Sequence, residues 1–108
     1  MAESPVVVVA TMIAKEGQED FLEKTLRTAI AAVHAEPGCL KYALHRKAGT
    51  TGHFVMIEKW ASAEALGVHG KAAALREAGP ALGQALTGPP EVQVFNPVPA
   101  GTDEQGAI

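Results

Sequence analysis

The segment Cys39–Trp60, with the sequence CLKYALHRKAGTTGHFVMIEKW, decides the fold. Its first part, Cys39–Arg46, alternates between apolar and polar side chains, as a β-strand with one buried face does. Its last part, Phe54–Trp60, is rich in bulky side chains that favour strands. Between these parts, Lys47–Gly52 is polar and contains two glycines. The segment therefore predicts an antiparallel hairpin.

The register of this hairpin determines which side chains share a face. We predict that Arg46 faces His53, which places Lys41 opposite Glu58 as a cross-strand pair of opposite charges. In this register one face of the hairpin carries a set of apolar side chains: Leu40, Tyr42, Leu44, Val55 and Ile57. The opposite face carries a second apolar set: Phe54, Met56 and Trp60. Both faces of the hairpin are thus predicted to be apolar.

The segments outside the hairpin complete the pattern of a small α+β domain. Val6–Ile13 is an apolar, mostly β-branched run, which is typical of a central strand. From about Gln18 to Ala35, apolar residues recur every three or four positions, which predicts an amphipathic helix. Glu91–Phe95 alternates again and is predicted as the last strand.

A second helical region is predicted in pieces. Ser62 is a good N-cap for a helix that Gly70 interrupts. The helix resumes over Ala72–Ala78, and Gly79-Pro80 is expected to end it, because proline lacks the N–H that an α-helix uses.

The resulting order, β-α-β-β-α-β, is that of a ferredoxin-like sandwich, an α+β fold with an antiparallel sheet and helices on one face. We predict a single domain over residues 6–98, with tails at residues 1–5 and 99–108. Because the helices can cover only one of the two apolar faces of the hairpin, the other face predicts a homodimer that packs sheet against sheet.

Composition argues against several classes of partner. The net charge is −3, and the nine Lys and Arg residues are scattered, so we expect no nucleic-acid binding. Apolar runs such as Val6–Ala10 are far too short to cross a bilayer, and residues 1–5 lack the basic region of a secretory signal. We therefore expect no membrane association and a cytoplasmic location. Cys39, the only cysteine, offers neither an internal disulfide nor a metal cluster.

Four motifs in series resemble one protein family. Glu36–Tyr42, EPGCLKY, resembles the E-P-G-C-x-x-Y signature of antibiotic biosynthesis monooxygenase domains. Phe54–Ser62 is similar to their F-x-x-x-E-x-W-x-S strand, and Ala65–His69 to the A-L-x-x-H of the following helix. Gly88–Val92 resembles the turn into their last strand. The resemblance covers residues 6–98 in the expected order and spacing.

The resemblance implies a dimeric α+β barrel in which two sheets pack face to face. Relatives include cofactor-independent oxygenases of anthrones and quinols, haem-degrading enzymes and some proteins that are not oxygenases. Haem degraders carry a second tryptophan on this helix and a later histidine; here the first position is His69, and Lys71–Leu86 contains no histidine. Haem therefore fits poorly, and the resemblance favours a monooxygenase without cofactor that uses dioxygen on a small aromatic quinol, polyketide phenol or anthrone.

His69 is the candidate catalytic residue. An oxygenase without metal or flavin must deprotonate its substrate to an electron-rich anion that reacts with dioxygen, which requires a base in an apolar pocket. Histidine is the usual base near neutral pH, and the resemblance places His69 at the family's helix position. The alternative is a histidine that packs at the end of its helix. No metal site is expected, since the histidines lack the spacing of a helical pair.

Four further residues are candidates for binding the substrate. Trp60 and Met56 are expected in the pocket wall, although Trp60 is equally a core tryptophan. Tyr42 can hydrogen-bond a substrate oxygen or pack in the core with its hydroxyl at the rim. His45 can reach the mouth of the pocket or remain an exposed hairpin residue. Glu58 is expected to pair with Lys41 or to hold the dimer together, and acts as a base only if buried.

Two other kinds of function stay open on the same residues. A non-catalytic or regulatory dimer can use the cavity to hold a small hydrophobic ligand, since no nucleophile triad is visible in the sequence. An isomerase or lyase on the same fold is the third possibility.

Overall fold

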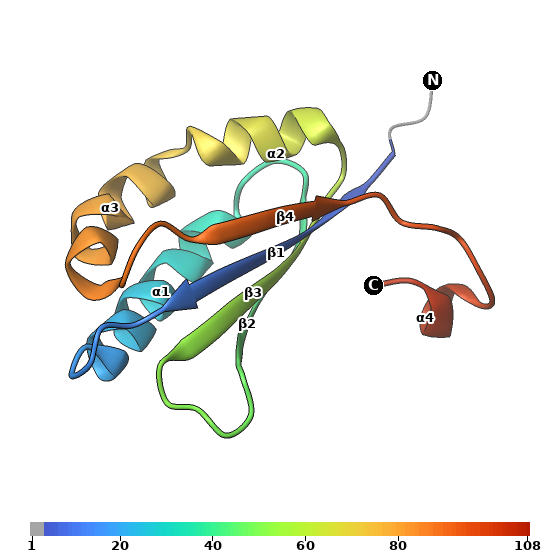
Figure 1. Cartoon of the computed structure of the whole chain (residues 1–108). Helices are drawn as coiled ribbons and strands as arrows, with labels where there is room; N and C mark the ends of the chain where they lie inside the picture. Colours follow the sequence, from blue (N-terminus) through green and yellow to red (C-terminus); the bar gives the residue numbers. More distant parts are fainter. Residues whose placement is uncertain (1–3) are drawn as a thin grey trace.

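The computed structural model describes residues 4–108 (Figure 1). The elements follow in this order: β1 (Val6–Ile13), α1 (Glu19–His34), β2 (Cys39–Arg46), β3 (His53–Trp60), α2 (Ala63–Gly70), α3 (Ala73–Ala85), β4 (Glu91–Phe95) and α4 (Asp103–Gly106). The predicted order β-α-β-β-α-β, with the second helical region in pieces, is confirmed up to β4. The short turn of helix α4 in the C-terminal tail was not predicted.

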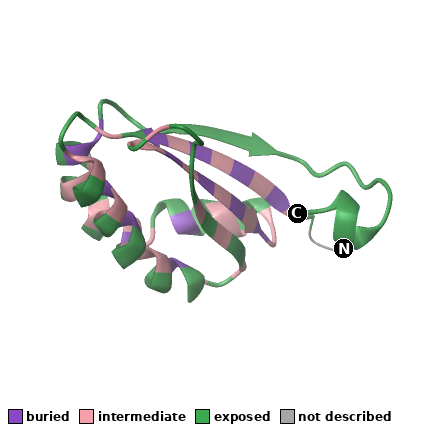
Figure 2. Ribbon diagram, turned by 90° about the horizontal axis from the view of Figure 1, so that it is seen from below, coloured by how far each residue is buried: buried purple, intermediate pink, exposed green. Residues whose placement is uncertain are grey.

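The strands form one antiparallel sheet in the order β2-β3-β1-β4, which is the order of a ferredoxin-like fold. Helices α1, α2 and α3 lie on one face of this sheet, and the other face is bare (Figures 1 and 2). Helix α1 packs against β2 and α3, and α2 contacts β3. No helix among residues 4–108 combines the length and apolar character needed to cross a membrane.

The predicted register of the hairpin is wrong by one residue. In the structure Arg46 pairs with Phe54, because the N–H of Lys47 donates to the carbonyl of His53 and so closes the loop one position later. Tyr42, rather than Lys41, therefore lies opposite Glu58. A slip of one residue moves every side chain of a strand to the other face.

The corrected register changes the composition of both faces. Tyr42 and Leu44 join Met56 under the helices, while Val55 and Ile57 remain on the bare face. The expected pair of Lys41 with Glu58 does not form.

A bulge between Cys39 and Lys41 adds one residue to β2. Residues three apart in a regular strand face opposite ways, yet Cys39 and Tyr42 both pack against the cluster around Trp60 under the helices. The extra residue, Leu40, is exposed.

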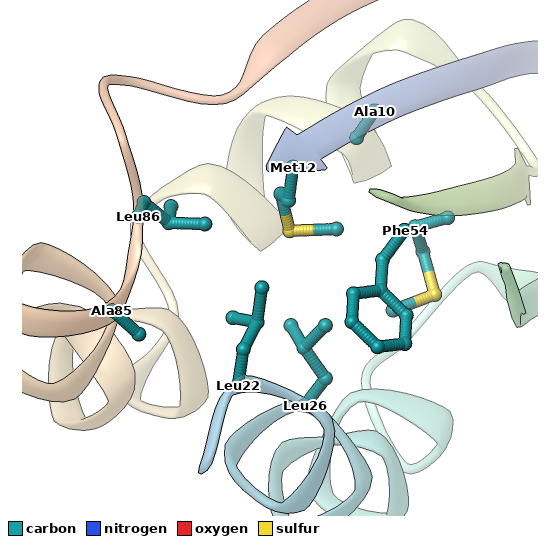
Figure 3. Close-up of a cluster of buried hydrophobic side chains, with 8 residues drawn as sticks. Ala10, Met12, Leu22, Leu26, Phe54, Ala85 and Leu86 are labelled. Atoms are coloured by element: carbon teal, nitrogen blue, oxygen red, sulfur yellow. The ribbon is translucent and has the colours of Figure 1, made fainter. Parts of the chain in front are cut away.

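The core lies between the sheet and the helices. β1 and β3 alternate strictly, with every second side chain buried. One buried cluster is shown in Figure 3: Ala10, Met12, Leu22, Leu26, Phe54, Met56, Ala85 and Leu86. A second cluster surrounds the fully buried Trp60: Val6, Val8, Val33 and Ala74.

The predicted break at Gly79-Pro80 is also wrong, since α3 runs from Ala73 to Ala85 through Pro80. The ring of Pro80 is exposed, so the helix loses one hydrogen bond without a clash in the core. Partly buried Leu75 and Leu82 keep the helical spacing on either side, and this packing outweighs the lost bond.

Helix α2 is fixed at its start by two local features. The Ser62 hydroxyl accepts from the N–H of Ala65, which confirms the predicted N-cap. Gly38 has φ +81°, and a Cβ at this position would lie 2.6 Å from the Cβ of Ala65. The chain before β2 therefore approaches α2 more closely than any other residue type would allow.

We expect Gly38→Ala to destabilise the protein more than Gly49→Ala. Both glycines have a positive φ, but a Cβ on Gly49 would meet no atom within 4 Å. The left-handed backbone costs each variant about 1–2 kcal/mol. The clash with Ala65 costs Gly38→Ala about 1–3 kcal/mol more. Urea denaturation of the two variants measures the difference, and an equal loss in both would contradict the close approach of Gly38 to α2.

Candidate functional site

A cavity of about 230 Å³ lies between the sheet and the helices. Its walls are mostly apolar and come from both the sheet and the helices: strand residues Val8, Ala10, Met12, Met56 and Val92, and helix residues Leu26, Ala29, Leu66, Leu75, Ala78 and Leu82. Three titratable side chains also line it: Tyr42, Glu58 and His69. An apolar cavity with a few converging polar groups is the usual form of a small-molecule site.

His69 is held by a carboxylate from a distant part of the chain. It lies in the last turn of α2 and is only 5% exposed. Its Nδ1 is 2.8 Å from Oε1 of Glu36, in the turn that precedes β2. Because a carboxylate only accepts hydrogen bonds, we assign a proton to Nδ1, so that in the neutral form of the ring Nε2 is the nitrogen that can accept a proton. Glu36 thus sets the tautomer and the orientation of the ring.

Glu58 is buried on the opposite side of the imidazole. Its Oε1 is 4.0 Å from Nε2 of His69 and accepts a hydrogen bond of 2.9 Å from the indole N–H of Trp60. Burial raises the pKa of the Glu58 carboxyl above its usual range, against the lowering effects of the Trp60 bond and of His69. Glu58 is therefore placed to exchange a proton with a ligand in the cavity.

Two aromatic rings fix the imidazole in place. Trp60 stacks on His69 with ring centroids 4.4 Å apart and planes inclined by 28°. Tyr42 meets His69 edge-on at 5.4 Å. Burial, and to a smaller extent the carboxylates of Glu58 and Glu36, raises the pKa of the Tyr42 hydroxyl above its usual range. Tyr42 consequently stays protonated at neutral pH and is available as a hydrogen-bond donor.

The structure brings together four of the five predicted site residues. His69, Tyr42 and Met56 line the cavity, and Trp60 stands behind His69. His45 does not lie with them. It pairs with Val55 on the bare face of the sheet, so strand alternation directs its ring away from the cavity.

Glu36 is a candidate site residue that was not predicted from the sequence. It belongs to the E-P-G-C motif, but 33 residues separate it from His69, and no periodicity connects the two. Glu58 was expected to be a base only if buried, and it is 4% exposed. The faulty register assigned it to Lys41 and so concealed its place beside His69.

Metal binding and thiol chemistry find no support in the side chains around this site. Among residues 4–108, no group of three or more His, Cys, Asp or Glu side chains is arranged to hold a metal ion. Cys39 is half-buried, and burial raises the pKa of its thiol, which disfavours the nucleophilic thiolate. His34 is exposed, and its Nε2 lies 3.0 Å from the carbonyl of Tyr42.

A family model described as antibiotic biosynthesis monooxygenase matches residues 5–80. The chain belongs to the antibiotic biosynthesis monooxygenase family. The matched range contains Glu36, Tyr42, Glu58, Trp60 and His69, so the whole polar cluster lies in the part that defines the family. No curated protein matches the chain.

Solved structures of similar proteins support the fold of this family member over nearly its whole length. A protein of Pseudomonas aeruginosa is 27% identical, with a TM-score of 0.85, over 92% of this chain and 99% of its own. One of Mycobacterium tuberculosis is 29% identical, with a TM-score of 0.83, over 92% of this chain and 100% of its own. A protein of Caulobacter crescentus, provisionally named an antibiotic biosynthesis monooxygenase, is 32% identical, with a TM-score of 0.82, over 90% and 92%.

The raised pKa of Glu58 predicts a specific dependence of stability on pH. Above the ordinary value of 4.5 the carboxyl ionises in the unfolded chain, while the folded chain still holds the proton. The folded state then binds more protons, so stability falls as pH rises from 4.5 until the folded pKa is passed. Glu58→Gln keeps the acceptor for Trp60 but cannot ionise. This variant should therefore lack the decrease in stability that the ionisation of Glu58 causes.

Urea denaturation between about pH 5 and pH 8 tests this expectation. The stability of Glu58→Gln relative to the wild type should increase as pH rises. Glu64→Gln, at an exposed position in the first turn of α2, is the matched control and should run parallel to the wild type. Parallel curves for Glu58→Gln as well would show that Glu58 ionises normally in the folded protein.

Proposed function

We propose that this protein is a cofactor-independent monooxygenase that oxidises a small aromatic quinol or phenol with dioxygen. The observation that carries the proposal is His69, whose Nδ1 is held by Glu36 and whose Nε2 can accept a proton beside an apolar cavity. Membership in the family supports the reaction type, and the haem-degrading branch is disfavoured by the absence of a histidine over Lys71–Leu86.

The size of the cavity favours a substrate head of one or two rings. A dry apolar cavity of about 150 Å³ is enough to bind benzene. The cavity here is about 230 Å³, which favours a substrate of one or two rings over a three-ring anthrone. A small quinol or naphthol-like phenol is therefore preferred to an anthrone.

In this mechanism the imidazole acts first. Nε2 of His69 accepts the proton of a ring hydroxyl, and Tyr42 donates a hydrogen bond to a substrate oxygen. The electron-rich anion then forms a carbon–oxygen bond with dioxygen at a ring carbon that carries hydrogen. Cleavage of the oxygen–oxygen bond leaves one oxygen atom on that carbon as a carbonyl. The other oxygen atom leaves as water with the two hydrogens that the substrate loses. Apolar walls around the anion exclude bulk water.

The pair of Glu58 and His69 also supports a second candidate function. Two proton-carrying groups 4.0 Å apart on one cavity wall can move a proton between neighbouring atoms of a ligand. An isomerase or lyase on a small carbonyl compound would use this pair without dioxygen. A regulatory dimer would use only the cavity.

The proposal includes a homodimer through the bare face of the sheet and a cytoplasmic location. Val7, Val9, Val55 and Ile57 form an apolar strip on that face, without a helix to cover it. The edge strand adds Phe95 next to Val7. A single cysteine without a partner suits a reducing compartment.

Ile57→Lys should separate the proposed dimer. Sedimentation at micromolar concentration is expected to give twice the 11.2 kDa of the chain for the wild type and a single chain for Ile57→Lys. The lysine places a charge in the middle of the apolar strip, which is unfavourable only if that strip is buried. Lys59→Glu, near the end of the same face, is a control for charge alone. A wild type that sediments as one chain would contradict the dimer.

His69→Ala should lower turnover about 100-fold or more, since positioned general bases contribute about 10²–10⁴-fold. His45→Ala, on the opposite face of the sheet, is the matched control and should keep the wild-type rate. The measurement is oxygen consumption by chelator-treated protein with a panel of one- and two-ring quinols and anthrones. Circular dichroism verifies that both variants are folded.

Three outcomes would decide between the candidate functions. Turnover that His69→Ala leaves unchanged would remove His69 from the mechanism. Ligands that raise the melting temperature without any consumption of oxygen would favour the binding dimer. Conversion of a carbonyl compound without consumption of oxygen would favour the isomerase or lyase.

A further inference from the structure

A groove of about 400 Å³ runs along the outer surface between α1 and α3. Most of its lining side chains are alanine or threonine: Thr25, Thr28, Ala29, Ala32, Ala74, Ala78 and Ala81. Phe21 and Lys24 from α1 and Glu77 from α3 complete it. The two helices pack against each other here with little side-chain bulk between them.

The groove meets the internal cavity at three residues. Thr25, Ala29 and Ala78 line both hollows, so one layer of small side chains separates the outside of the helix pair from the cavity. At the end of this layer, Pro80 lacks the N–H that would bond to the carbonyl of Arg76. At the seam between α1 and α3 the wall of the cavity is thus one layer of small side chains, and it borders a turn of α3 that lacks one hydrogen bond.

The polar side chains of His69 and Glu58 line the cavity. His69 is 95% buried, yet within the described chain its Nε2 makes no hydrogen bond, and Oε1 of Glu58 is 4.0 Å away. At the outer end, the ring of Phe21 lies in the groove and is 39% exposed. The path therefore runs from a free imidazole nitrogen, through apolar walls, to an exposed aromatic ring.

We propose that the cavity and the groove form one binding site for a hydroxylated aromatic compound that carries an aliphatic chain. The ring lies against His69, and the chain passes between Ala29 and Ala78 into the groove and ends on Phe21. The position of the ring rests on the proposed function, whereas the path of the chain rests on the three small residues, Thr25, Ala29 and Ala78, that line both hollows. The substrate class is thereby narrowed to phenols or quinols with a linear apolar tail.

Trp60 provides the measurement, because it is the only tryptophan and stacks on His69. Phenol and a series of 4-alkylphenols of increasing chain length are titrated into the wild-type protein at concentrations where the ligands stay monomeric. Each methylene that enters the seam should tighten binding about fourfold, which corresponds to about 0.8 kcal/mol per buried CH₂. The gain should stop when the chain reaches the open end of the groove.

Ala78→Leu should close the seam. This variant is expected to lose the gain in affinity with chain length, which is measured relative to the variant's own affinity for phenol because Ala78 also lines the cavity. Ala73→Leu, at an exposed position on the same helix outside the groove, is the matched control and should keep the full gain. Phe21→Ala should weaken only the longest ligands, several-fold, since only their ends reach it.

The outcomes separate this inference from the proposed function. If phenol binds without oxidation, and alkyl chains still tighten binding only through an open seam, the chain path stands and the oxygenase fails. If phenol is oxidised but longer chains bind no tighter, the path is wrong and the oxygenase stands. An equal gain in Ala78→Leu and the wild type would also overturn the path, because the chain would then lie elsewhere. Failure of phenol itself to quench Trp60 would overturn the placement of the ring.

Discussion

The hydrogen bond between Glu36 and His69 is the constraint on which the rest of the site depends. It joins the turn before β2 to the last turn of α2, two segments that are 33 residues apart in the chain. Because both side chains are largely shielded from water, this hydrogen bond is stronger than the same bond would be on the surface. The bond orients the imidazole, and the close approach of Gly38 to Ala65 holds the two segments at the distance that the bond requires. The stacking of Trp60 and the position of Glu58 follow from this placement of the ring.

In this small domain a cavity occupies part of the space between the sheet and the helices that packed side chains would otherwise fill. Helix α3 packs on α1, and α2 packs on β3, whereas the space between α3 and the sheet contains the cavity. The buried carboxyl of Glu58 and the half-buried carboxyl of Glu36 beside a histidine cost free energy that a hydrophobic core would not. Such a cost is common where a site needs groups that folding alone would not select. The polar cluster is therefore better explained by chemistry than by stability.

The sequence predicted the elements well because their signals are local. The apolar run of β1 and the helical spacing of α1 each lie within a few turns of chain, and both matched within one residue of their bounds. The register of β2 and β3 depends on how the loop closes and on the bulge after Cys39, neither of which leaves a pattern in composition. The contact of Glu36 with His69 is long-range and appears only when the turn and α2 are placed in space. The predicted end of the helix at Gly79-Pro80 was wrong because the tertiary packing of α3 outweighed the low helix propensity of proline.

The bulge in β2 determines which face of the sheet each later side chain of the strand occupies. Leu40 is the extra residue, and its insertion lets a motif that begins at Glu36 and a strand that carries Tyr42 present their side chains to the same cavity. Successive side chains of a strand point to opposite faces, so one inserted residue moves every later side chain to the opposite face. A relative with one residue more or fewer between the positions of Glu36 and Tyr42 can direct both side chains to the cavity by gaining or losing the bulge. Alignment across Leu40 should therefore allow a one-residue gap, where a comparison without gaps would turn Tyr42 out of the site.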